Sequence, residues 1–394
     1  MFSEPFPAAK QQQNSSRSTS IEGLLFMAIF IKTLFNIIAE RKETVYIFSR
    51  DYYTVRWPAI HDQECCLMNI NVSCHLDPLA LQEYIGQVFG SSYVVSGVSR
   101  MHGGAQKVVY KVDCTNGFSC VLYVWDLSMN FFQQEIVQNT INASSYGSGL
   151  FASSNSFLKE HSIRTPALYD LNNDRTDYTF DYALVEYIDG QKAEAYFSHP
   201  DPEVKEHVLQ QVGTLVTAMH NIKRNTFGAP EQHRNVRQTG QCHLMLQDNA
   251  KLQLAYAVQY IDLINSNKEK LLDKLDELAA RIGPRTEYGL IHDELGPDHL
   301  LVNERLEPYL IDIEGVRFFD IEHEHSFLEF RFGEYYRYLQ NDTLDPDRMR
   351  FYRFHHHIAL ISAGLKLLHR GYPDQQFSRN LSRYHTELAM RYIE

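Results

Sequence analysis

The sequence predicts a two-lobed α+β fold, in which a small antiparallel β lobe precedes a larger helical lobe. Short β-patterned runs separated by turn residues occupy the stretch 94–125, and a further run ends at the turn Asp189-Gly190. Helix-spaced apolar residues dominate the chain beyond this turn. The chain has 394 residues, 44% of them hydrophobic, which is enough for two or three domain-sized units. We expect the small lobe at 76–190 and the helical lobe at 191–394.

The first part of the chain differs in composition from the rest, and we expect residues 1–75 to form a weakly ordered appendage. Residues 11–20 are rich in glutamine and serine, and Lys32 interrupts an apolar run at 24–38. That run is shorter than the roughly 20 residues of a membrane-spanning helix. Two interpretations stay open: an anchor or interfacial helix, and a segment outside the functional polypeptide, which would then begin near Met68.

Composition and charge indicate which kinds of binding partner the protein can have. The net charge is −12 and the isoelectric point is about 5.8. Nucleic-acid binding needs clustered Lys and Arg to neutralise phosphates, so a nucleic-acid partner is disfavoured and a cationic or neutral small molecule fits better. The six cysteines show no Cys-x-x-Cys spacing. These features predict reduced thiols in a cytoplasmic protein and do not favour a membrane partner.

Local signals predict each element of the small lobe. Asp77 and Pro78 are typical of the cap and first turn of a helix, which we expect to end near Phe89. Apolar and alternating runs predict strands at 94–99, 107–113 and 120–125, a helix at 149–161 and a strand at 183–188. Adjacent Gly103 and Gly104 lie in the turn between the first two strands, where a plain hairpin would also explain them.

The segment 288–315, YGLIHDELGPDHLLVNERLEPYLIDIEG, concentrates histidines and carboxylates in a strand, loop, strand, turn, strand pattern. The strand predicted at 309–313 should direct Asp312 and the following Glu314 to the same side, because residues two apart on a strand share a face. The loop after the first strand carries Glu294. Glu294 and Asp312 are therefore expected to converge on one site.

This segment resembles the active-site segment of the aminoglycoside phosphotransferase family, which reads His-Gly-Asp, four residues, Asn and later Ile-Asp. The matching positions are His292-Asp293-Glu294, His299 and Ile311-Asp312. The resemblance implies a protein-kinase-like fold and transfer of the γ-phosphoryl group of ATP or GTP to a hydroxyl of a small molecule, aminoglycoside-like or a related metabolite. It also implies that Glu294 is the catalytic base and that His299 and Asp312 bind Mg²⁺ or Mn²⁺.

The resemblance also implies a nucleotide site in the small lobe. Main-chain amides at Gly103 and Gly104 would cover the phosphates. The run LVEYIDG resembles the hinge of the family, so Glu186, Tyr187 and Ile188 would present main-chain groups to the adenine edge. An ordinary edge strand and turn is the alternative interpretation of this run.

Two of the positions with an implied catalytic or metal-binding role depart from the family pattern. Glu294 replaces an aspartate but keeps a carboxylate on a longer stem, so it can still accept a proton. His299 replaces an asparagine and offers a softer ligand, which suits manganese or zinc better than magnesium. Asp298 could supply the oxygen ligand instead.

The small lobe departs from the family at an ion pair. Tyr123 stands where the family has a lysine that contacts the phosphates, and Phe151 stands where its partner glutamate is sought. Loss of both partners is more tolerable than loss of one, because neither charge is left unpaired. The phosphate charge would then fall to a metal ion, to main-chain amides, or to Lys107 or Lys111.

The remaining patterns describe the helical lobe. Helix-spaced apolar residues predict helices at 203–221 and 254–282. The C-terminal part, 345–392, is expected to be helical and to form core and substrate-cleft wall of this lobe. Acids and histidines alternate at 322–325, which predicts a charged rim able to attract a cationic substrate. Histidines two apart with no third ligand near them do not predict a zinc site.

Two alternatives to an active phosphotransferase stay open. The departures at Tyr123, Glu294 and His299 would also suit a non-catalytic, pseudokinase-like nucleotide-binding module. A metal-dependent phosphohydrolase could instead use His292-Asp293 with the run at 322–325.

Overall fold

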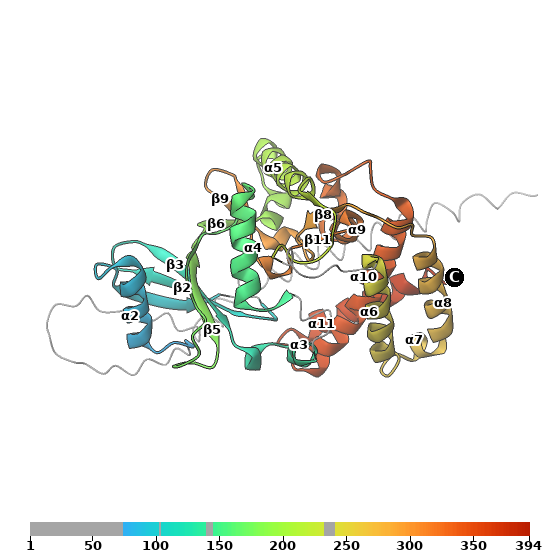
Figure 1. Cartoon of the computed structure of the whole chain (residues 1–394), viewed down its shortest axis with the longest axis horizontal. Helices are drawn as coiled ribbons and strands as arrows, with labels where there is room; N and C mark the ends of the chain where they lie inside the picture. Colours follow the sequence, from blue (N-terminus) through green and yellow to red (C-terminus); the bar gives the residue numbers. More distant parts are fainter. Residues whose placement is uncertain (1–73, 102–103, 139–144, 232–240) are drawn as a thin grey trace, which may run out of the picture. The chain divides into compact units, whose positions relative to one another are not determined.

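The structure is a computed structural model that describes residues 74–101, 104–138, 145–231 and 241–394 (Figure 1). The appendage predicted at 1–75 lies outside these ranges except for its last two residues, and Gly103 also lies outside them. Within the described ranges, no helix combines the length and the apolarity needed to span a bilayer.

A five-stranded antiparallel sheet forms the small lobe, in the order β1-β2-β3-β5-β4. Its strands are β1 (Val95–Arg100), β2 (Val108–Cys114), β3 (Ser119–Trp125), β4 (Leu168–Asn172) and β5 (Asp181–Glu186). Helix α2 (Pro78–Phe89) precedes the sheet, and the Asp77 carboxylate caps it by accepting from two amides of its first turn. The helix and the strands predicted for this lobe are thus confirmed.

Strand β3 is the centre of the sheet and is buried on both faces. Leu122 packs with Ile85 of α2 in one core cluster. Tyr123 and Trp125 pack in the other core cluster against Phe151 of α4 (Ser148–Glu160). A continuous apolar run such as CVLYVW is what a strand covered on both faces requires.

The rest of the described chain is mainly helical (Figure 1). Its longer helices are α5 (Pro202–His220), α6 (Cys242–Ala257), α8 (Lys268–Ala280), α9 (Ile321–Phe332), α10 (Pro346–His369) and α11 (Gln375–Met390). Helix α10 packs against α6, α9 and α11. Two small antiparallel sheets, ordered β10-β9-β6 and β11-β8-β7, accompany the helices. Their strands are β6 (Gly190–Lys192), β7 (Lys223–Arg224), β8 (Tyr288–Ile291), β9 (Leu300–Asn303), β10 (Pro308–Leu310) and β11 (Arg317–Phe319).

The continuous helix predicted at 254–282 is wrong, because α6, the short α7 (Asp262–Ser266) and α8 share this stretch. Helix α6 ends where the carbonyl of Ala257 accepts from the amides of both Tyr260 and Ile261, at 3.0 and 3.1 Å. The apolar residues before and after the break still face one core cluster. Their periodicity therefore continues through the turns and conceals them.

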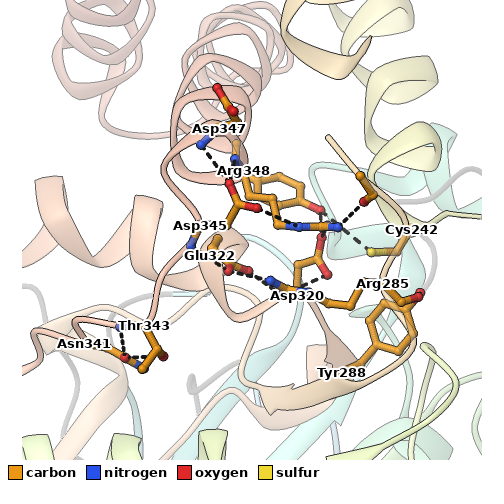
Figure 2. Close-up of polar contacts among 12 residues, drawn as sticks. Cys242, Arg285, Tyr288, Asp320, Glu322, Asn341, Thr343, Asp345, Asp347 and Arg348 are labelled. Carbon is orange, nitrogen blue, oxygen red and sulfur yellow. Dashed lines mark hydrogen bonds and ion pairs between the residues drawn. The ribbon is translucent and has the colours of Figure 1, made fainter. Parts of the chain in front are cut away.

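A buried network of charges joins β11, α9 and α10 (Figure 2). Asp320 is fully buried and accepts hydrogen bonds from Arg348 and Tyr352, while Arg285 approaches it at 3.3 Å. The same Arg285 forms two hydrogen bonds, of 2.6 and 2.7 Å, with the carboxylate of Glu322. Such bidentate Arg-carboxylate pairs fix the relative orientation of the elements that carry them.

The charged rim predicted at 322–325 is wrong. All four side chains are buried, with exposed fractions between 0% and 4%. They belong to the first turn of α9, which packs into the helical core, and partners in that core take the place of solvent. These acids cannot attract a cationic substrate from solution.

The short helix α3 (Gln133–Val137) is tied to the C-terminal end of α10 by Glu135. Its carboxylate accepts two hydrogen bonds from Arg370, of 2.8 and 2.9 Å, and lies 3.0 Å from the Lys366 ammonium. Burial alone would raise the pKa of Glu135, but these cations hold it at about 2. The contact joins the segment after the small sheet to the helical part.

Candidate functional site

The loop 292–299 lies between β8 and β9, and a buried carboxylate of α9 fixes the main chain at its start. Glu324 Oε1 accepts the amides of His292 and Asp293, at 2.8 and 2.9 Å. Its Oε2 lies 2.6 Å from Nε2 of His220, the last residue of α5. Burial raises the pKa of Glu324 to about 7, as expected for a carboxyl group without solvent. The backbone is therefore held immediately before Glu294.

His292 is a structural residue of this loop. The side chain is fully buried, and Nε2 donates to the carbonyl of Ile311 at 2.8 Å. Burial lowers the pKa of the imidazole, with the neighbouring His299 adding to the effect. His292 thus links the loop to the residue that precedes Asp312.

Asp293 occupies the position of the family's glycine and has a positive φ of 83°. This region of φ favours glycine, and aspartate is among the few other residues that enter it readily. Its carboxylate accepts from Arg317 Nη2 at 2.6 Å and lies 3.3 Å from His323 Nδ1. The contacts of the Asp293 carboxylate therefore stabilise a positive-φ conformation that glycine adopts without side-chain contacts.

Asp312 reaches the site by a route that differs from the predicted strand. Strand β10 ends at Leu310, Asp312 adopts the left-handed conformation (φ 62°, ψ 44°), and a 3-10 helix follows at Ile313–Gly315. The expectation that Asp312 and Glu314 share one face of a strand is wrong in its geometry. Both carboxylates nevertheless meet at one cation, Lys107.

Lys107, at the start of β2, supplies a buried positive charge to the site. Its ammonium group donates to Asp312 Oδ1 and to Glu314 Oε1, the latter at 2.7 Å. Trp125 Nε1 donates to the same Glu314 oxygen at 3.1 Å. Burial alone would lower the pKa of Lys107, but the two carboxylates raise it well above its usual value, so the group stays charged.

An aromatic pair fills the place of the family's lysine-glutamate ion pair. The rings of Tyr123 on β3 and Phe151 on α4 meet edge to face, with centroids 5.3 Å apart. The Lys107 ammonium lies 5.0 Å from the centroid of the Tyr123 ring. The ammonium group of Lys107 thus lies near Tyr123, the position at which the family has its lysine, but Lys107 comes from the residue before β2 and not from β3.

His299 is oriented as a ligand toward Asp312. Its Nδ1 donates to the carbonyl of Glu294 at 2.7 Å, so in the neutral ring Nε2 carries the lone pair. That Nε2 lies 3.6 Å from Asp312 Oδ2 and 3.8 Å from Asp298 Oδ2. The other oxygen of Asp298 binds Arg331. The imidazole nitrogen of His299 and one carboxylate oxygen of Asp312 therefore face each other, as two ligands of one divalent cation would.

Glu294 is exposed to solvent at the same site. Surrounding protein atoms limit the hydration of its carboxylate and raise its pKa, and the charge of Asp312 raises it further, while His299 opposes the shift. A raised pKa brings a carboxylate closer to the range in which it can exchange protons near neutral pH.

The loop before β2 is shaped for close backbone contact. Gly104 has a φ of 85°, and a Cβ there would lie 2.6 Å from the carbonyl oxygen of Lys107. The loop is anchored by Asn130, whose side-chain amide donates to the carbonyl of Gln106 at 3.1 Å. Gly104 is therefore required by the turn itself, whereas its predicted partner Gly103 falls outside the described residues.

The predicted hinge follows directly after β5. The Glu186 amide donates to the carbonyl of Ala167 at 2.8 Å, and its carboxylate accepts the Ala167 amide at 2.9 Å. The Ile188 amide has no hydrogen-bond acceptor among the described residues. Tyr187 lies under the ammonium of Lys111, 4.5 Å from the ring centroid. A free main-chain donor is thus available at Ile188.

Two surface cavities share no lining residue with the loop 292–299, with Lys107, Asp312 and Glu314, or with the predicted hinge. One, of about 440 Å³, is lined by Tyr336 and Arg353 among others, and the second, of about 400 Å³, by Asn225 and Arg285 among others. The open position of Glu294 and Asp312 suits a site that closes around its ligands rather than an enclosed cavity.

The sequence argument missed Glu324, and a local signal could have found it. Glu324 falls between Ile321 and Leu328, at the three- and four-residue spacing of the apolar side of α9. A carboxylate at such a position predicts a buried polar partner rather than a charged rim.

The fold and the site together define a protein with a kinase-like, two-lobed architecture. A solved thermostable mutant of aminoglycoside phosphotransferase APH(4)-Ia, in ternary complex with ADP and hygromycin B, is 16% identical, with a TM-score of 0.54 over 78% of this chain and 98% of that chain. Spectinomycin phosphotransferase APH(9)-Ia, with ADP and spectinomycin, is 14% identical, with a TM-score of 0.54 over 80% of this chain and 98% of that chain. LicA with AMP is 13% identical, with a TM-score of 0.51 over 79% of this chain and 97% of that chain. At these identities the likeness establishes the fold, and the predicted fold class is confirmed.

The family follows from the sequence profile of the phosphotransferase enzyme family, which matches residues 151–352, just over half of the chain. The chain belongs to this family, and the resemblance drawn from 288–315 is confirmed. No curated protein matches the sequence.

Proposed function

We propose that this protein transfers the γ-phosphoryl group of ATP or GTP to a hydroxyl group of a small molecule. The observation that carries the proposal is the meeting of Lys107, Asp312 and His299 Nε2 beside the exposed Glu294. Phosphoryl transfer needs positioning and charge stabilisation more than covalent chemistry, and these groups supply both.

Asp312 and His299 would hold the divalent ion that accompanies the nucleotide. Oδ1 of Asp312 is engaged by Lys107, whereas Oδ2 faces His299 Nε2 at 3.6 Å, so a carboxylate oxygen and an imidazole nitrogen are directed at one place. The bound ion neutralises charge on the phosphate oxygens. Mixed N and O donors favour Mn²⁺ over Mg²⁺ relative to an all-oxygen set.

Glu294 would accept the proton of the acceptor hydroxyl. As the hydroxyl oxygen forms its bond to the γ-phosphorus, the bond from that phosphorus to the bridging oxygen of the nucleoside diphosphate breaks, and the proton passes to the Glu294 carboxylate. The clamp by Glu324 on the preceding amides fixes the backbone from which Glu294 extends. Lys107 would stabilise the charge on the phosphate oxygens.

The nucleotide would lie between the loop at Gly104 and the hinge. Main-chain amides around Gly103 and Gly104 would cover the phosphates. The free amide of Ile188, with main-chain groups of Glu186 and Tyr187, would pair with the base edge. The solved structures of APH(4)-Ia and APH(9)-Ia hold ADP, which supports a nucleotide as the second substrate here.

The acceptor class rests on the family and on charge. The similar structures hold hygromycin B and spectinomycin, and the net charge of −12 suits a cationic or neutral hydroxylated compound of this kind. The phosphohydrolase alternative loses support, because His292 and Asp293 are engaged by Ile311 and Arg317. A non-catalytic nucleotide-binding module remains the competing function.

Ligand-dependent stability and turnover test the proposal. Full-length protein is melted with ATP or GTP, each with Mg²⁺, Mn²⁺ or chelator, and nucleotide at a hundred times its dissociation constant should add about 2.7 kcal/mol of stability. Acceptors are then screened by nucleoside diphosphate release. We expect Glu294→Gln to lower turnover about 100- to 10,000-fold while nucleotide affinity stays within about twofold. Binding without turnover in either form would favour the non-catalytic module, and no metal-dependent binding would refute the proposal.

A further inference from the structure

We propose that three buried histidines, His323 of α9 with His355 and His356 of α10, form a binding site for a transition-metal ion of the zinc class. The site is separate from His299 and Asp312, and it does not depend on the proposed function. Each ring offers one nitrogen, and these nitrogens lie within 4.8 Å of one another. In a zinc site, with bonds of about 2.0–2.1 Å, ligand nitrogens are about 3.4 Å apart, so small side-chain rotations would close the set.

The first argument is burial without partners. The three side chains are only 4% to 5% exposed. Both ring nitrogens of His355, and Nδ1 of His323, have no hydrogen-bond partner among the described residues. Buried polar atoms in native proteins are almost always satisfied, so a group of unpartnered imidazole nitrogens calls for an occupant. A bound metal ion would satisfy one nitrogen of each ring, because each neutral imidazole carries one lone pair.

The second argument is the direction of the lone pairs. His356 Nε2 donates to the carbonyl of His323 at 2.9 Å, which leaves the lone pair of the neutral ring on Nδ1. This is the arrangement of metal-binding histidines, whose second nitrogen donates to a carbonyl or carboxylate. The rings of His323 and His356 are 4.5 Å apart, and those of His355 and His356 are 5.4 Å apart.

The third argument is the state and identity of the donors. Burial lowers the pKa of all three rings, so they are neutral and able to bind a metal at physiological pH. Three imidazoles suit zinc, whereas Mg²⁺ and Ca²⁺ require oxygen ligands. Asp293 Oδ1 lies 3.3 Å from His323 Nδ1, close enough to orient the His323 ring.

The positive charge of Arg317 lies near the three histidines and restricts which metal ions could bind there. Arg317 lowers the pKa of these histidines and would repel a cation, but it is paired with Asp293, and its guanidinium lies 4.2 Å from the centroid of the Phe319 ring. Only an ion with strong affinity for imidazole would overcome this charge. Spacing along the sequence did not predict this site, because α9 and α10 bring its ligands together from positions 32 and 33 residues apart.

Bound metal would reach the catalytic loop through Asp293. This residue follows His292 and precedes Glu294, and its positive φ is held by its side-chain contacts. An ion that fixes the His323 ring would therefore also fix Asp293, which contacts that ring, and with it the conformation of the loop next to the proposed base. The proposed metal ion would thus have a structural role and would take no part in phosphoryl transfer.

The test uses full-length protein produced in medium supplemented with zinc or with cobalt, so that the buried site can fill as the chain folds. Metal content is measured after extensive dialysis against chelator, in an Asp312→Asn background that removes the other candidate ion site. We expect about one zinc per chain, and a cobalt form with the strong visible absorption of tetrahedral coordination.

Matched variants locate the ligands. His355→Gln should reduce bound metal to less than about one tenth of an equivalent. His357→Gln, on the same helix, removes a histidine that instead pairs with His385 at 3.0 Å, and should leave the metal in place. If His355→Gln does not fold, X-ray absorption at the zinc edge of the Asp312→Asn protein should show a shell dominated by imidazole nitrogen. The proposal would be overturned if the purified protein contained no metal, or if folded His355→Gln kept its metal. X-ray absorption that shows no histidine ligands would also overturn it.

Discussion

Lys107→Met is expected to weaken binding of the metal-nucleotide complex by about 10- to 150-fold, because a hydrogen bond to a charged group contributes about 1.5–3 kcal/mol. The Lys107 side chain is 6% exposed, and Asp312 and Glu314 hold its ammonium beside the proposed metal ligands. Isothermal titration with ATP and Mn²⁺ measures the change without knowledge of the acceptor.

The same substitution should lower the free energy of unfolding. Removing one partner of a buried ion pair costs about 3–5 kcal/mol. Asp312 is 44% exposed and partly screened by water, so we expect about 2–3 kcal/mol, with Glu314 accounting for most of it. Urea unfolding measures the loss and shows that the variant is folded under the conditions of the titration.

Lys111→Met provides the matched control on the same strand. Lys111 pairs with Asp113 at 3.0 Å and makes no contact with Asp312 or Glu314 among the described residues. Its replacement should change nucleotide affinity by less than about threefold, as expected for a surface ion pair. Unchanged affinity in folded Lys107→Met, or a larger loss in Lys111→Met, would refute the assignment of the phosphate cation to Lys107.

Three further outcomes are expected. Arg348→Met should destabilise the protein by about 3–5 kcal/mol, since it leaves the fully buried Asp320 with fewer partners, whereas the exposed Arg350→Met should change urea unfolding by less than about 0.5 kcal/mol. His299→Asn should shift the preference of nucleotide binding from Mn²⁺ toward Mg²⁺, and an unchanged metal ratio in titrations would remove His299 from the ligand set. The pKa of Glu135 falls from 4.5 to about 2 on folding, so its stabilisation is present above pH 4.5 and lost as the pH falls through 2. Between pH 4.5 and 2, the free energy of unfolding of the wild type should therefore fall by about 3 kcal/mol more than that of Glu135→Gln, as measured by urea unfolding of both proteins. Equal losses would contradict the lowered pKa of Glu135.

Local patterns in the sequence predicted much of the fold. The cap at Asp77, the strands of the small sheet, and the hairpin of β9 and β10 all depend on neighbouring residues, and each lies close to its predicted place. The helix boundaries between 254 and 282 were missed because apolar periodicity continues across turns that face the same core.

Contacts between distant residues could not be read from such patterns. Lys107 and Asp312 are 205 positions apart, and the sequence could offer Lys107 only as one of several possible cations. Glu324 was assigned to a charged rim because alternation of acids and histidines was weighed above its place on the apolar side of a helix. The predicted roles of Glu294, His299 and Asp312 remain predictions, now with a geometry that experiments can address.

The proposed role of Lys107, which immediately precedes β2, has a consequence for chemical profiling. Reactive nucleotide analogues that acylate a lysine beside the phosphates should modify Lys107, in the peptide that also contains Gly104. Surveys that recognise active members of this fold by a labelled lysine on β3 would classify this protein as inactive, because β3 offers only Tyr123 at that place. Peptide mapping around the glycine loop is therefore the appropriate way to detect the proposed nucleotide site.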